Sequence, residues 1–174
     1  VYESKNVCML KMTDKFAETT GVVNWGGGIL AIGYDSGSGT WLMGGENGKL
    51  NEYTGAHFIN RSGDLVSWGF SDVGAIAHNG SYWLIGGSNA KILNRWDGSG
   101  SFTDVTSNLV NFGAGIKSMD YKNTTPEYWL IGGVNGSLNK YDGTTWSDLK
   151  TGLGFGTDEV THIISVSYTH LRAH

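Results

Sequence analysis

The strongest constraint on the fold is a segment that occurs three times along the chain, at residues 41–53, 82–98 and 128–143. In each copy an apolar run reaches a Gly-Gly pair, and a short polar loop leads to a second run that ends at an aromatic residue. The first and third copies place Asn47-Gly48 and Asn135-Gly136 in that loop, and Asn-Gly supplies the positive φ angles of a type I′ turn. Each copy is therefore predicted to form a β-hairpin.

The middle copy differs from the other two in its loop. It has Asn89-Ala90 in place of Asn-Gly, and it is one residue longer between its Gly-Gly pair and its aromatic residue. Alanine has a steric penalty at positive φ that glycine does not have. An extra residue suits a longer connection or a bulge. We therefore expect Ala90 to lie in a wider connection than the two Asn-Gly turns.

A second repeated element precedes each hairpin and sets the period of the fold. It consists of a branched, a variable, a small and an apolar residue, and it begins at Ile29, Val73, Ile116 and Val160, at intervals of 44, 43 and 44 residues. A period in this range, made of short strands, is typical of a β-propeller, in which each repeat forms one four-stranded blade. We predict an all-β fold of four-stranded antiparallel blades, with strands A to D in chain order.

The repeats predict an open arc. Complete blades are expected at about residues 29–61, 73–107 and 116–150. Residues 1–20 have the pattern of strands C and D of a preceding blade, and residues 160–165 that of the start of a following blade. An arc leaves apolar faces and strand edges uncovered at both ends. We therefore expect residues 1–165 alone to be marginally stable and to self-associate, with the remaining blades supplied by a full-length protein.

Residues 166–174 depart from the repeat, which calls for another Trp-Leu-Ile-Gly-Gly in this region. This nonapeptide resembles the translation of a sequencing adapter, so it is interpreted as a non-native tail. The alternative is a divergent natural end. On the first interpretation, His170 and His174 are not candidate ligands.

Composition excludes several classes of function. The net charge is −4 with no cluster of lysine or arginine, so a nucleic-acid partner is not expected. The chain has no run of about 18 apolar residues, so no membrane span is expected either. The single cysteine, Cys8, excludes an internal disulfide and a cysteine zinc site. His57, His78 and His162 lack the spacing of metal ligands, and we expect no metal and no cofactor.

Other features favour an extracellular or cell-surface location. Only 16% of the residues are charged, and Ser, Thr and Asn are frequent. Four Asn-x-Ser/Thr glycosylation sequons begin at Asn60, Asn79, Asn123 and Asn135.

The third repeat resembles the Kelch repeat of β-propellers. Its apolar strand reaches Gly132-Gly133, and Tyr141-Asp142 is followed by Trp146. The resemblance extends from residue 29 to about 150. The chain departs from the Kelch pattern because proline does not follow Tyr-Asp, and because Phe58 and Phe102 replace the tryptophan in the other repeats. Residues 97–102 and 142–146 are also similar to the Asp-box of sialidase-type propellers.

The resemblances imply a binding function more readily than catalysis. A sialidase-like site needs an arginine cluster, and Arg61 and Arg95 are the only arginines before the tail. We therefore expect no catalytic residue in this chain, and a binding or scaffold module whose ligand, a glycan, a peptide or a protein, sits on the loop face. The alternative is a carbohydrate-active propeller enzyme whose catalytic residues lie outside this chain.

One set of aromatic residues is the candidate ligand-binding site. An aromatic residue followed by glycine stands just before each A strand, at Trp25, Trp68, Phe112 and Phe155. The connections from strand D to strand A lie on the same face as the B–C hairpins, around the central channel. The four rings are therefore predicted to form a stacking collar for a sugar or a peptide. The alternative is that they pack between neighbouring blades.

Overall fold

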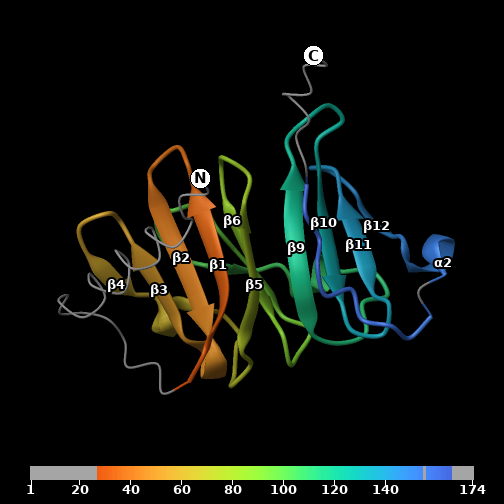
Figure 1. Cartoon of the computed structure of the whole chain (residues 1–174), viewed down its shortest axis with the longest axis horizontal. Helices are drawn as coiled ribbons and strands as arrows, with labels where there is room; N and C mark the ends of the chain where they lie inside the picture. The colour runs from red at the N-terminus through yellow and green to blue at the C-terminus, as the bar shows by residue number, and fades with distance from the viewer. Residues whose placement is uncertain (1–26, 155, 166–174) are drawn as a thin grey trace, which may run out of the picture.

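The computed structural model describes residues 27–154 and 156–165, and this part of the chain forms three four-stranded antiparallel sheets (Figure 1). In each sheet the strands lie side by side in chain order. The described helical segments are short: three single 3₁₀ turns, η1 (Glu46–Gly48), η2 (Ser62–Asp64) and η3 (Thr106–Asn108), and one turn of α-helix, α2 (Lys150–Leu153). None of them could span a membrane.

The strands are named β1 to β12. The first sheet contains β1 (Ile29–Asp35), β2 (Thr40–Gly45), β3 (Leu50–Tyr53) and β4 (Phe58–Asn60). The second contains β5 (Val73–His78), β6 (Trp83–Gly87), β7 (Leu93–Trp96) and β8 (Thr103–Asp104). The third contains β9 (Ile116–Lys122), β10 (Tyr128–Gly133), β11 (Leu138–Tyr141) and β12 (Trp146–Asp148).

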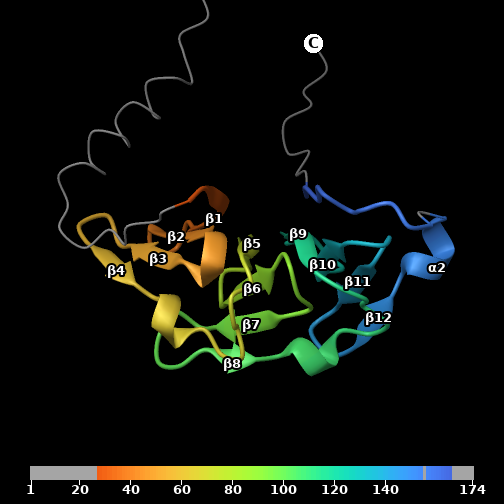
Figure 2. The same cartoon turned by 90° about the horizontal axis from the view of Figure 1, so that it is seen from below.

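The three sheets are arranged as blades of an arc (Figure 2). The first strands, β1, β5 and β9, lie on the concave side, and the last strands, β4, β8 and β12, lie on the convex side. Because neighbouring strands are antiparallel, the A–B and C–D loops gather at one end of the arc, here called the groove face. The B–C hairpins and the D–A connections gather at the opposite end, the hairpin face.

Both Asn-Gly turns have the predicted backbone. Asn47 and Gly48 have φ of 55° and 69°, and Asn135 and Gly136 have φ of 57° and 66°. The backbone N–H of the residue after each pair donates to the carbonyl of the residue before it. Two consecutive left-handed residues at the tip are the signature of a type I′ turn, so the turn prediction is confirmed for these two hairpins.

The middle hairpin is wider, as the loss of glycine predicts. Gly87 N donates to Ile92 O at 2.9 Å, which leaves four residues, 88–91, in the connection. Ala90 does not have a positive φ. The extra residue thus allows the chain to turn without placing a Cβ atom in the left-handed region.

Contacts between blades follow one rule. The first glycine of each Gly-Gly pair lies against the branched residue that starts the next blade. A Cβ atom built on Gly86 would lie 2.7 Å from Ile116 Cγ2, and one on Gly132 would lie 2.5 Å from Val160 Cγ1. Gly44 has the same relation to Val73. The glycine pairs therefore allow the close approach of neighbouring sheets.

The core of each blade ends in a ladder of aromatic rings near the groove face. In the second blade His78 pairs with Trp83 across two strands, and the ring of Trp96 stacks on Phe102 at 5.1 Å between centroids. Trp83, Trp96 and Trp129 are almost fully buried. Corresponding pairs occur in the other blades, Tyr34–Trp41 and Tyr53–Phe58, and Tyr121–Trp129 and Tyr141–Trp146. Aromatic cross-strand pairs stabilise sheets.

The two predicted partial blades have different outcomes. Residues 1–20 and 166–174 lie outside the described residues. Residues 160–165 form no strand, but they dock on the third blade as a first strand would: Val160 N donates to Gly133 O at 2.9 Å, and Val160 and Ile163 both lie against Gly132. No described strand follows to pair with this segment. It therefore packs as strand A does, but without the hydrogen bonds that strand A makes to strand B.

Candidate binding site

The predicted collar residues that the structure describes are buried. Trp68 is 5% exposed, and its Nε1 donates to Ser71 O at 2.6 Å. Phe112 is 3% exposed, and its ring lies against Gly133. Both rings belong to hydrophobic cores of the arc, so the packing alternative accounts for these two positions. Trp25 and Phe155 lie outside the described residues. A ligand-binding role for the four aromatic residues stays a prediction.

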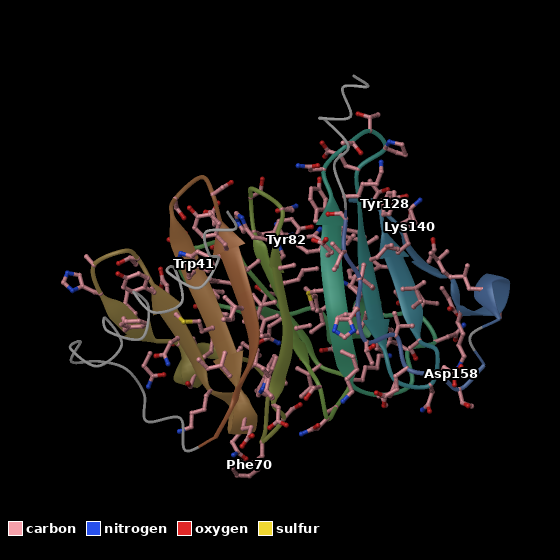
Figure 3. All side chains as sticks on the ribbon, viewed as in Figure 1. Trp41, Phe70, Tyr82, Tyr128, Lys140 and Asp158 are labelled. Carbon is pink, nitrogen blue, oxygen red and sulfur yellow. The ribbon has the colours of Figure 1, made fainter. Side chains whose placement is uncertain are left out.

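The exposed ring on the first D–A connection is Phe70, two residues after Trp68. Phe70 is 87% exposed, and it lies at the hairpin face (Figure 3). The Trp-Gly pattern identified the connection but not the ring that faces solvent. Trp68 is buried with its indole N–H bonded within the same turn, whereas the Phe70 ring is exposed.

A hollow with charged and aromatic walls lies on the groove face, between the second and third blades. Its volume is about 270 Å³. It is here called the Tyr82 groove. It is lined by residues from both blades: Asn79, Tyr82, Arg95, Tyr121, Glu127, Tyr128, Trp129, Tyr141, Asp142 and Gly143. Figure 3 shows Tyr82 and Tyr128 toward the end of the arc opposite Phe70.

One wall of the Tyr82 groove is held by contacts that cross between the blades. Trp129 Nε1 donates to the Tyr82 hydroxyl at 2.9 Å, and the two rings stack at 5.6 Å between centroids. The Arg95 guanidinium lies over the other side of the wall, 4.0 Å from the centroid of the Tyr82 ring. Arg95 is exposed, so its N–H groups remain accessible at the mouth of the groove. Burial raises the pKa of Tyr82, which keeps its hydroxyl neutral.

The opposite wall carries a carboxylate in a fixed position. The Tyr121 hydroxyl donates to Glu127 Oε2 at 2.6 Å. This hydrogen bond, with burial as a second cause, raises the pKa of Tyr121 to about 12. Tyr121 therefore stays protonated at neutral pH, and Glu127 presents its negative charge to the groove.

A second carboxylate lies at the end of strand β11. Asp142 Oδ1 accepts hydrogen bonds from the backbone N–H groups of Thr145 and Thr144 and from the Thr144 hydroxyl. These bonds lower the pKa of Asp142 to about 2. The groove thus combines aromatic walls, one arginine and two carboxylates.

An equivalent hollow of about 290 Å³ lies between the first and second blades. Its most distinctive feature is the pair Asp35–His78, with Asp35 Oδ1 3.3 Å from His78 Nδ1. Burial lowers the pKa of His78, and the charge of Asp35 opposes this shift. Burial alone would raise the pKa of Asp35, but hydrogen bonds from Ser38 and Gly37 and the charge of His78 lower it. The lining also includes hydroxyl groups and two further carboxylates, from Ser38, Thr40, Ser81, Ser99, Glu52 and Asp97.

Neither hollow offers a metal centre. Among the residues that the structure describes, no group of three or more His, Cys, Asp or Glu side chains could hold a metal ion. The Asp35 carboxylate instead caps its own loop, through the N–H of Gly37 and the hydroxyl of Ser38.

Sequence reasoning missed the residues of the Tyr82 groove. A signal was present, because Tyr82 and Tyr128 each precede the tryptophan of the repeat, and Arg95 interrupts an otherwise buried strand. Tyr82 and the Trp129 that holds it lie 47 positions apart in the chain. Only the packing of one blade on the next shows that they share a wall.

Comparison with known proteins identifies the fold. No protein-family model matches the chain, and no curated protein matches it. Among solved structures, the chain is similar to the WD40 β-propeller domain of Doa1, with a TM-score of 0.50 and 8% sequence identity. The match covers 74% of this chain and 42% of that structure, so this chain spans less than half of its length. Membership of the Kelch group stays a prediction. The chain is an all-β arc of three β-propeller blades.

Proposed function

We propose that the chain is a non-catalytic binding module that recognises an extended peptide segment of a partner protein in the Tyr82 groove. The observation that carries the proposal is the arrangement of Arg95 over Tyr82 at the mouth of a preformed aromatic hollow. Tyrosine, tryptophan and arginine are the residues most enriched at the energetic centres of protein interfaces.

The chemistry of the groove favours a particular kind of peptide. The rings of Tyr128 and Tyr141 suit an apolar or aromatic side chain. The carboxylates of Glu127 and Asp142 suit a lysine or arginine side chain nearby. The N–H groups of Arg95 are donors for a peptide carbonyl or carboxylate. The net charge of −4 also favours encounter with a basic partner.

Selection from a peptide library tests this proposal. Peptides displayed at random are selected on the full chain and then measured by calorimetry against variants. We expect selected peptides to contain a basic and an aromatic residue, and Arg95→Gln and Glu127→Gln to weaken binding at least about tenfold, which is about 1.4 kcal/mol. Lys150→Gln, in α2 and outside the groove, is the matched control. Selected peptides whose affinity Arg95→Gln leaves unchanged would contradict the proposal.

Glycan binding is a second candidate function, and the hollow between the first and second blades favours it. Its lining of hydroxyl and carboxylate groups offers hydrogen-bond partners to a sugar. A glycan array tests it, with Asp97→Asn and Ser81→Ala as variants. Loss of a glycan signal in these variants, but not in Arg95→Gln, assigns the glycan to this hollow.

We also propose an extracellular or cell-surface location, on the basis of the four sequons. Asn123 is the most suitable acceptor because it is exposed in the A–B loop of the third blade, whereas the exposed Asn60 and Asn135 lie in β4 and in a type I′ turn. Expression through a secretory pathway, followed by glycosidase treatment, should show a mass shift that Asn123→Gln reduces. A secreted product without attached glycan would remove the support for this location.

A further inference from the structure

A buried asparagine fixes the connection between the first and second blades. Asn94 is the second residue of β7, and its side chain is fully buried. Its Oδ1 accepts a hydrogen bond from Val66 N at 2.7 Å, and its Nδ2 donates one to Val66 O at 3.1 Å. The amide therefore pairs with the backbone of the D–A connection as a neighbouring strand would.

The same arrangement recurs one blade later. Asn139 is the second residue of β11 and is 1% exposed. Val110 N donates to its Oδ1 at 2.7 Å, and its Nδ2 donates to Val110 O at 2.9 Å. Each of these blades thus receives the incoming chain through one asparagine, and the residue that it holds is a valine.

The first blade has the asparagine but lacks the partner. Asn51 is the second residue of β3, and it pairs in register with Met43 as Asn94 pairs with Ile85. It is fully buried, yet within the described part of the chain neither its Oδ1 nor its Nδ2 has a hydrogen-bond partner. Buried amides are normally satisfied. The Asn51 side-chain amide has the donor and the acceptor needed to hold the C=O and the N–H of one backbone residue. Asn94 holds Val66 in this way, and Asn139 holds Val110.

The sequence contains a third copy of the segment that the asparagines hold. Val66 begins Val-Ser-Trp-Gly and Val110 begins Val-Asn-Phe-Gly, and Val23 begins Val-Asn-Trp-Gly. Val66 precedes Asn94 by 28 residues, and Val110 precedes Asn139 by 29. Val23 precedes Asn51 by 28 residues. Residue type and spacing therefore point to the same segment.

We propose that Asn51 is the docking point for residues 23–26 of this chain, with the Val23 N–H bonded to Asn51 Oδ1 and the Val23 carbonyl to Asn51 Nδ2. The first blade then receives the chain before it in the same register as the second and third blades do. We call this pairing of a buried asparagine side chain with the backbone of the incoming connection the asparagine latch. It is repeated along the chain and sets the position of each blade relative to the connection that enters it.

Nuclear magnetic resonance on the wild-type full chain tests the proposal without any substitution. We expect nuclear Overhauser contacts between the Asn51 side-chain amide protons and the backbone of residues 23–24, matching those between Asn94 and residues 66–67. The Val23 amide should exchange with solvent at least about 100-fold more slowly than in an unfolded chain. Absence of the contacts together with unprotected exchange at Val23 would overturn the proposal.

Substitution of Asn51 with leucine should change the urea midpoint in opposite directions, depending on whether Asn51 is unpaired or holds Val23. If Asn51 is unpaired, Asn51→Leu replaces a costly buried amide by an apolar group of similar volume and raises the urea midpoint. If Asn51 holds Val23, the substitution lowers the midpoint, as Asn94→Leu does, and speeds exchange at Val23 at least about tenfold while leaving Val66 unchanged. A raised midpoint, or protection of Val23 that disappears on dilution and so comes from a second copy, would overturn the intrachain latch.

Discussion

The Arg95 guanidinium lies 4.0 Å from the centroid of the Tyr82 ring, and the Tyr82 hydroxyl accepts a hydrogen bond from Trp129 of the next blade. Arg95, the more exposed of the two described arginines, is therefore positioned by a ring that is itself fixed across a blade boundary. A preformed site of this kind loses less entropy when a ligand binds than a mobile one does. This is why we assign recognition to the groove between blades and not to a single loop.

The first prediction concerns Tyr121 at the opposite wall of the Tyr82 groove. Its pKa is raised to about 12, mainly by its hydrogen bond to Glu127. The raised value means that the contact contributes stability below pH 10 and loses it as the pH rises through about 12. Ultraviolet titration of the tyrosinate absorbance should show a late step that Tyr121→Phe removes. Glu127→Gln should move this step toward pH 10.

The second prediction concerns contact between blades at Gly86. Ala at this position would place its Cβ 2.7 Å from Ile116 and 2.8 Å from Met119, so the two sheets must separate or repack. We expect Gly86→Ala to lower the free energy of unfolding by about 1–3 kcal/mol. Urea melts measure this, with Gly63→Ala as control because no atom lies within 4 Å of its added Cβ. Equal effects of the two substitutions would show that the glycine pair does not govern the packing of the blades.

The third prediction separates the two roles of Trp68. Its ring is buried in a core with Leu50 and Val73. Trp68→Ala should therefore lower the free energy of unfolding by about 3–5 kcal/mol, the usual cost of deleting a buried tryptophan. Phe70→Ala should have a small effect on stability, because Phe70 is exposed. If instead Trp68→Ala abolished ligand binding with little change in the melting temperature, the predicted aromatic collar would be supported.

Much of the fold could be predicted from the sequence because its signals are local. The Asn-Gly turns at 47–48 and 135–136 and the wider loop at Ala90 follow from residues that are neighbours in the chain. The period follows from the regular spacing of short repeated segments. The groove could not be predicted in this way. Tyr82 and Arg95 form a wall of the groove only because Trp129, which belongs to another blade, bonds to Tyr82.

The aromatic residues before each A strand also show what the sequence alone could not predict. The pattern placed Trp68 and Phe112 correctly in the D–A connections, but sequence alone does not say whether a ring points to solvent or to a core. The indole N–H of Trp68 bonds within its own turn and so permits burial, and Phe112 has no polar group to keep at the surface.

The fourth prediction concerns self-association through the first blade. Leu30, Ile32 and Tyr34 of β1 are 47%, 49% and 47% exposed on one side of the sheet. The partial blade expected in residues 1–20 would supply only strands C and D, which lie at the outer end of a blade, so this inner strip stays open. Ile32→Lys should reduce association in sedimentation velocity, whereas Leu153→Lys, at an exposed leucine in α2, should not. A wild-type chain that sediments as a monomer at all concentrations would contradict the prediction.

The central claim is that the ligand binds on the groove face, and hydrogen exchange in the presence of the selected peptide tests it most directly. The account predicts slower exchange in the loops that line the Tyr82 groove, at residues 79–82, 121–129 and 141–143. It predicts no change in the hairpin face at residues 46–49, 66–72 and 134–137. Protection confined to the hairpin face, around Trp68 and Phe70, would contradict the account and place the ligand at the opposite end of the arc.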